Sequence, residues 1–140
     1  MSNEKNRAEA LRWLRTADDD LDTAVILKDN KKFAHACFHA QQAAEKALKA
    51  LWINADAEPW GHSIQKLIED LQTVDLELFE VFKGLSRLGN LLDRFYIPTR
   101  CPNGLPDLTP DVVFEEEDAQ TCIQSARKIV DEVHQRFKSR

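Results

Sequence analysis

Apolar residues recur every three or four positions over most of the chain, which is the spacing of one face of an α-helix. In residues 4–27 this face is formed by Ala10, Leu14, Ala17, Leu21 and Ala24. Residues 32–54 repeat the pattern with a wider stripe, in which many alanines allow neighbouring helices to approach closely. The pattern therefore predicts two long helices, each burying one face.

The same spacing continues in the second half of the chain. It predicts a shorter helix over residues 62–72, another from Asp75 to about residue 92, and a last helix from about residue 115 to the end. Gly84 and Gly89 interrupt the fourth segment, and each costs a helix about 1 kcal/mol relative to alanine. The apolar spacing nevertheless passes through both glycines.

Four of the five prolines fall between Ile97 and Phe114, a segment of about 18 residues that cannot form a continuous helix. A loop of this length suggests a function beyond connection. With no internal repeat and no linker, we expect a single domain over residues 1–140. Its predicted fold is all-α, an antiparallel up-and-down helical bundle of about five helices.

Composition narrows the possible functions. A net charge of −5 argues against a general nucleic-acid coat, although a local basic site stays open. The three cysteines show no CxxC spacing, and no apolar run reaches the ~20 residues that a membrane helix needs. No catalytic triad, glycine-rich phosphate loop or HExxH motif occurs. We therefore expect a cytoplasmic protein without a membrane segment, a metal or another cofactor.

A polar stripe follows the second predicted helix. Its candidate functional residues are His39, Gln42, Glu45 and Lys46. His35 and His39 lie one turn apart, a spacing that suits a metal, but no further ligands stand nearby. The stripe is therefore interpreted as a polar edge that either makes hydrogen bonds or contacts a partner. Glu45 and Lys46 either belong to a catalytic cluster or form an ordinary solvated helix face.

The most distinctive polar candidates lie where the fourth helix runs into the proline-rich segment. Arg94, Tyr96 and Arg100 could bind a nucleotide or RNA, because guanidinium groups match phosphate oxygens and a tyrosine ring can stack on a base. The alternative is that Arg94 pairs with an acid on a neighbouring helix and that Tyr96 is half-buried packing.

Several segments, in the right order, resemble a known family. Residues 37–51, CFHAQQAAEKALKAL, are similar to the signature helix of small prokaryotic HEPN proteins. Residues 96–102, YIPTRCP, resemble the family's Y-I-x-T/S-R-Y-P segment, with Cys101 where tyrosine is usual. The resemblance implies an antiparallel helical bundle that usually forms a homodimer. It also implies a nucleotidyltransferase protein partner in a toxin–antitoxin-like system.

Many members of that family are metal-independent ribonucleases that use an arginine followed, after four to six residues, by a histidine. After Arg94 the corresponding positions hold Thr99, Arg100 and Cys101, so the expected general base is missing. We therefore expect a homodimeric binding module rather than an enzyme. A metal-independent ribonuclease with a degenerate motif is the alternative. Trp52 and Trp60 exceed what one small bundle readily buries, which also favours an interface.

Overall fold

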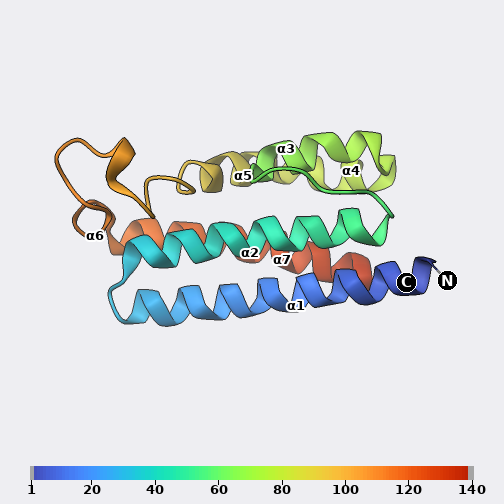
Figure 1. The fold of residues 1–140 in the computed structure, drawn as a ribbon, viewed down its shortest axis with the longest axis horizontal. Coiled ribbons are helices and arrows are strands. Elements are labelled where there is room, and N and C mark those ends of the chain that lie inside the picture. The colour runs from blue at the N-terminus through green and yellow to red at the C-terminus, as the bar shows by residue number, and fades with distance from the viewer. Residues whose placement is uncertain (1, 139–140) are drawn as a thin grey trace.

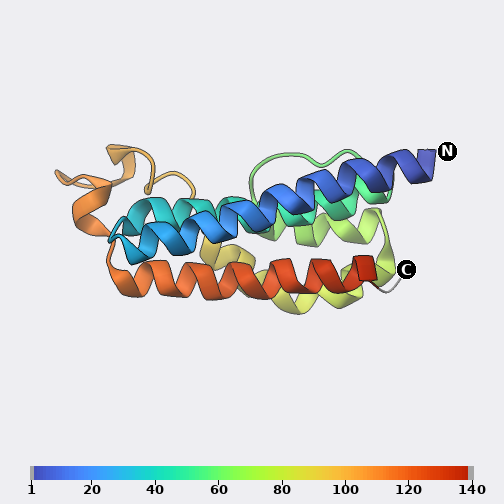
Figure 2. The ribbon, with the colours of Figure 1, turned by 90° about the horizontal axis from the view of Figure 1, so that it is seen from below.

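Three long helices form the body of the molecule, as the computed structural model of residues 2–138 shows (Figure 1). They are α1 (Ser2–Asp29), α2 (Phe33–Asn54) and α7 (Glu116–Lys138). α1 packs along both α2 and α7 and runs antiparallel to them, so that the two chain ends lie at the same end of the molecule (Figures 1 and 2). The predicted all-α bundle is confirmed.

A fourth limb of short helices covers α2 on its other side (Figure 1). It consists of α3 (Ile64–Glu69), α4 (Leu76–Phe82) and α5 (Ser86–Asp93). Short 3₁₀ helices, η1 (Asp70–Thr73) and η2 (Lys83–Leu85), join these helices. The helices predicted over residues 62–72 and 75–92 are therefore each divided, and Gly84 lies in η2, where the second one is divided.

Side-chain caps fix where two of the short helices begin. The Ser63 hydroxyl accepts a hydrogen bond from the Lys66 amide, at 3.1 Å, and so caps α3. The Asp75 carboxylate accepts from the amides of Glu77 and Leu78 and caps α4. Such caps satisfy amides that have no partner inside the helix, which explains why each helix starts directly after its cap.

α3 and α5 meet closely at Gly89. A Cβ atom at this position would lie 2.9 Å from Cγ2 of Ile64 and 3.0 Å from the amide nitrogen of Gln65. The Asp93 carboxylate then accepts hydrogen bonds from the Ser63 hydroxyl, at 2.8 Å, and from the amides of Ile64 and Gln65. The end of α5 is thus held against the start of α3, and this contact positions the segment that follows.

Trp52 belongs to the core of the molecule, contrary to the expectation from the sequence. Trp52 is only 8% exposed, and its indole nitrogen donates a hydrogen bond to the Leu67 carbonyl at 3.2 Å. The prediction that Trp52 is left over for an interface was wrong, because α3 folds back over the end of α2 and covers it. Trp60, in contrast, is 77% exposed.

The proline-rich segment forms a lobe beside the turn between α1 and α2 (Figure 1). It contains one short 3₁₀ helix, η3 (Pro102–Gly104), and the single-turn helix α6 (Pro110–Val113). No helix within residues 2–138 is both long and apolar enough to cross a membrane.

Candidate functional site

Two consecutive turns replace the helix after Asp93. The amide of Tyr96 bonds to the Asp93 carbonyl, and the amide of Arg100 bonds to the Ile97 carbonyl. The buried Thr99 hydroxyl donates to the Phe95 carbonyl. Because these bonds fold the segment back on itself, Tyr96 and Arg100 come together on one surface.

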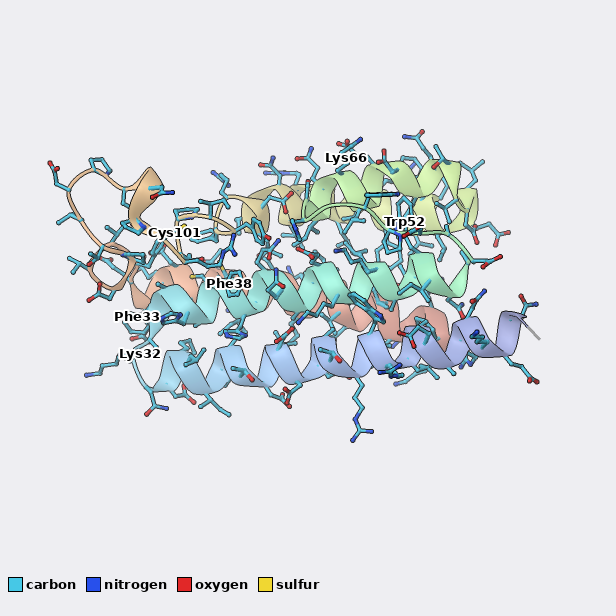
Figure 3. All side chains as sticks on the ribbon, viewed as in Figure 1. Lys32, Phe33, Phe38, Trp52, Lys66 and Cys101 are labelled. Carbon is cyan, nitrogen blue, oxygen red and sulfur yellow. The ribbon has the colours of Figure 1, made fainter. Side chains whose placement is uncertain are left out.

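Arg100 lies over two aromatic rings. Its Nε donates to the Tyr96 carbonyl at 3.0 Å, and its guanidinium carbon is 4.3 Å from the centre of the Tyr96 ring. The same carbon is 5.1 Å from the ring centre of Phe38, which α2 directs toward the loop (Figure 3). This geometry allows cation–π attraction while leaving the Arg100 side chain exposed to solvent.

His62 completes this cluster from a different part of the chain. Its imidazole stacks on the Tyr96 ring, with centroids 4.9 Å apart and planes inclined by 20°. The Phe38 ring also lies beside Tyr96, with 6.2 Å between the two ring centroids. We call Phe38, His62, Tyr96 and Arg100 the aromatic corner. Of these four residues, Tyr96 and Arg100 had been predicted from the sequence as candidates for nucleotide or RNA binding.

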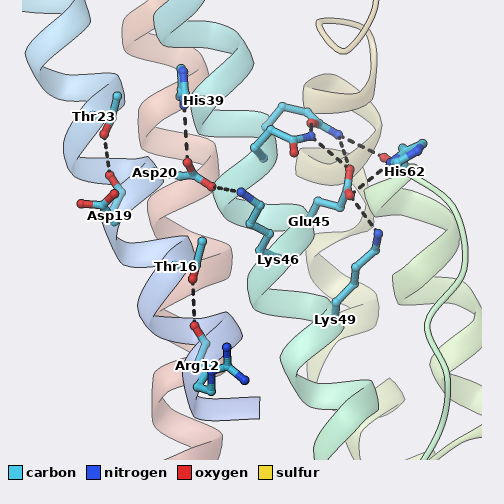
Figure 4. Close-up of polar contacts among 12 residues, drawn as sticks. Arg12, Thr16, Asp19, Asp20, Thr23, His39, Glu45, Lys46, Lys49 and His62 are labelled. Carbon is cyan, nitrogen blue, oxygen red and sulfur yellow. Dashed lines mark hydrogen bonds and ion pairs between the residues drawn. The ribbon is translucent and has the colours of Figure 1, made fainter. Parts of the chain in front are cut away.

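Glu45 holds His62 in place. Its side chain is largely buried, and the carboxylate accepts a hydrogen bond from Lys49 Nζ at 3.0 Å, while His62 Nδ1 lies 3.2 Å away (Figure 4). The side-chain amides of Gln41 and Gln42 donate hydrogen bonds to the other carboxylate oxygen. In the tautomer that carries its proton on Nδ1, His62 donates a hydrogen bond to Glu45 and presents Nε2 as an acceptor. Glu45 is therefore a buried anchor, and the solvated-face interpretation was wrong for it.

Asp20 on α1 binds the other two residues of the predicted polar edge. Lys46 Nζ lies 2.7 Å from one carboxylate oxygen, and His39 Nδ1 lies 3.4 Å from the other (Figure 4). Burial raises the pKa of Asp20, but the hydrogen bonds and charges of His39 and Lys46 outweigh it, and the pKa is lowered overall. His39 and Lys46 therefore join α1 to α2, away from Glu45.

Arg94 is exposed and its side chain makes no hydrogen bond or ion pair within residues 2–138, so the predicted alternative of an ion pair with a neighbouring helix was wrong. His35 is exposed as well. Among residues 2–138, no three or more His, Cys, Asp or Glu side chains are grouped so that they could hold a metal ion.

Comparison with known proteins decides the family. The model of the HEPN domain matches residues 10–136. The chain belongs to the HEPN family. Among solved structures, TT1696 from Thermus thermophilus superimposes with a TM-score of 0.82 and 36% identity, covering 90% of this chain and 96% of the other.

Two further HEPN structures are similar over 91% of this chain. ST0689, an archaeal HEPN homologue, has a TM-score of 0.72 and 31% identity over 96% of its chain. The HEPN domain protein TM0613 of Thermotoga maritima has a TM-score of 0.70 and 27% identity over 98% of its chain. A Methanocaldococcus jannaschii protein, MJ1304, which carries the provisional name of a toxin, is 20% identical over 133 residues, or 91% of this chain and 88% of its own.

The fold of this chain brings a histidine, His62, to the aromatic corner, where the ribonuclease sequence pattern provides none. No histidine follows Arg94 at the spacing of the ribonuclease pattern. His62 belongs instead to the segment before α3, and the hydrogen bonds from Ser63 and Ile64 to the Asp93 carboxylate hold that segment beside the end of α5. The signal available in the sequence was the Gly61–His62 pair ahead of the α3 apolar residues.

Proposed function

We propose that this HEPN protein is a toxin-like binding module that holds a nucleotide or an RNA end at the aromatic corner. The observation that supports it best is the position of Arg100 over the Tyr96 ring, on which His62 also stacks. Exposed guanidinium groups bind phosphate, and aromatic rings stack on bases regardless of sequence. Arg94 adds a second exposed cation on the same segment.

The module is proposed to act as a homodimer with a nucleotidyltransferase partner. Trp60 supports an interface, since its side chain is 77% exposed and tryptophan is enriched at protein interfaces. The toxin name of the MJ1304 protein supports a role in a toxin–antitoxin-like system. Light scattering at micromolar concentration tests the dimer, and a monomer contradicts it. Co-purification with the product of a neighbouring nucleotidyltransferase gene tests the pairing.

Binding is tested by fluorescence anisotropy with a labelled single-stranded oligoribonucleotide. Tyr96→Ala removes the ring on which Arg100 and His62 rest, so both groups lose their position. We expect a loss of the size measured for an aromatic residue that binds a base, about 1–3 kcal/mol or roughly 5- to 150-fold in affinity. Tyr96→Phe keeps the ring and is the matched control, with affinity close to that of the wild-type protein. Equal affinity for the wild type and Tyr96→Ala contradicts the proposal.

A metal-independent ribonuclease is the second candidate, and His62 is the observation that favours it. When Nδ1 of His62 donates a hydrogen bond to Glu45, Nε2 of His62 is free to accept a proton from a ribose hydroxyl. Arg94 or Arg100 would then stabilise the charge that develops on the phosphate.

Cleavage of RNA in excess chelator, by the wild type beside His62→Ala and Arg94→Ala, separates this candidate from simple binding. Cleavage that disappears in both variants establishes the enzyme. No cleavage by the wild-type protein, with RNA binding intact, leaves the binding module.

A further inference from the structure

A basic groove adjoins the aromatic corner, between the start of α2 and the proline-rich lobe. Its volume is ≈ 520 Å³. The basic residues of its lining are Lys31, Lys32, His35 and Arg100. The one acid among the lining residues is Asp111. The protein as a whole has a net charge of −5, so the excess of basic over acidic residues in this groove is local.

The basic side chains of the groove are free to bind a ligand. Within residues 2–138, Lys31, Lys32 and His35 make no side-chain hydrogen bond or ion pair. Arg100 uses only its Nε, on the Tyr96 carbonyl. Asp111 accepts a hydrogen bond from the Thr109 hydroxyl. In the part of the chain that the structure describes, the groove therefore presents three cations without an ion-pair partner, Lys31, Lys32 and Arg100, against the one carboxylate of Asp111.

The first turn of α2 adds to the positive potential. Phe33, Ala34 and His35 line the groove, and no side chain caps this end of the helix. The helix is 22 residues long, so the partial positive charge of its dipole acts on the same space. An anion in the groove would meet both this dipole and the lysines.

Arg100 belongs to both features. It lines the groove, and its guanidinium lies over Tyr96 and Phe38 in the aromatic corner. A ligand with one base at the corner would therefore pass Arg100 as its backbone enters the groove. Alternating bases and phosphates are the chemistry of a single-stranded nucleic acid, whose bases stack on aromatic rings and whose phosphates follow cations.

We infer that the groove carries the phosphate backbone of a single-stranded RNA whose terminal base lies at the aromatic corner. This inference rests on the proposed function and extends it, because it makes the ligand a strand rather than a mononucleotide. It also assigns residues 31–35 to RNA binding, which no sequence motif indicated.

The test compares two double variants that change the net charge equally. Lys31→Gln with Lys32→Gln alters the groove, whereas Lys5→Gln with Lys128→Gln removes two exposed lysines from α1 and α7. Equal melting temperatures of the two variants confirm that both fold alike. Each is titrated with a labelled RNA of about 12 nucleotides, a length within the usual site size, and with a dinucleotide that reaches only the corner.

The groove variant is expected to bind the longer RNA roughly tenfold more weakly than the control variant does. Its plot of log affinity against log salt concentration should flatten by about 1.4, because each lost phosphate contact removes about 0.7 from the slope for single strands. Dinucleotide affinity should be the same in both variants.

Three results overturn the inference in distinguishable ways. If both double variants bind the longer RNA as tightly as the wild type, while Tyr96→Ala loses binding, the groove is refuted and the proposed function stands. Equal weakening of both relative to the wild type shows a general charge effect and also refutes the groove. No binding of either RNA by the wild-type protein refutes the proposed function and the groove together.

Discussion

The imidazole of His62 stacks on the ring of Tyr96 at a centroid distance of 4.9 Å, although the two residues lie on different segments. Two fixed points create this contact. Glu45 holds His62 from α2, and Asp93 ties the start of α3 to the end of α5, shortly before Tyr96. The stability of the corner therefore depends on groups that are not part of it.

Glu45 is the first of these groups to test. Replacing it with alanine leaves Lys49, whose side chain is 12% exposed, without its carboxylate. We expect the free energy of unfolding to fall by about 2–4 kcal/mol, because a largely buried charge loses its partner. Glu45→Gln, which keeps the hydrogen-bonding shape, should cost less. Urea denaturation measures both.

The control for this experiment is Glu58→Ala, at an exposed position between α2 and α3, where a change within about 0.5 kcal/mol is expected. A Glu45→Ala protein as stable as this control would contradict the anchoring role of the carboxylate.

Because of Asp20, the free energy of unfolding is expected to depend on pH. Its pKa in the folded protein is lowered from the ordinary value of 3.8 by His39 and Lys46, so ionised Asp20 stabilises the folded state. This contribution is complete above the unfolded pKa and disappears as the pH falls through the lowered folded pKa.

The free energy of unfolding of Asp20→Asn, compared with the wild type from about pH 3 to pH 7, measures this contribution. The difference should be constant above about pH 5 and shrink below about pH 4. Asp19→Asn, on an exposed neighbouring residue, should show no such trend. A difference between wild type and Asp20→Asn that grows on acidification has the wrong sign for this explanation.

The two glycines of the fourth limb should respond oppositely to alanine. At Gly89 a Cβ meets the backbone of α3, so Gly89→Ala should destabilise the fold by about 1–3 kcal/mol despite alanine's better helix propensity. At Gly84 nothing lies within 4 Å, so Gly84→Ala should be neutral or stabilising by up to about 1 kcal/mol. Thermal unfolding compares them, and equal effects would contradict the close packing of α3 on α5.

Sequence reasoning treated these glycines alike, because apolar spacing describes one helix at a time. It predicted the long helices, since a helix buries one face whatever packs against it. It could not show which element covers α2. The segment before α3 folds over Gln41 and Glu45, with Gln41 donating to the His62 carbonyl at 3.0 Å. This contact turns part of a polar stripe into a buried network.

The candidate site was predicted in part for the same reason. Tyr96 and Arg100 share a short segment, so their residue types and spacing indicated a joint role. Phe38 and His62 reach the corner only through the packing of α2, α3 and α5. The grouping of His39 with Asp20 likewise depends on how α1 crosses α2, which periodicity does not determine.

Photo-cross-linking is the most direct test of RNA binding at the aromatic corner. A single-stranded RNA that carries 4-thiouridine at its end is irradiated with the wild-type protein, and cross-linked peptides are identified by mass spectrometry. We predict cross-links to the peptides that contain Phe38, His62 or Tyr96. Cross-links confined to another surface, or none at RNA concentrations that saturate binding, would contradict the proposed site.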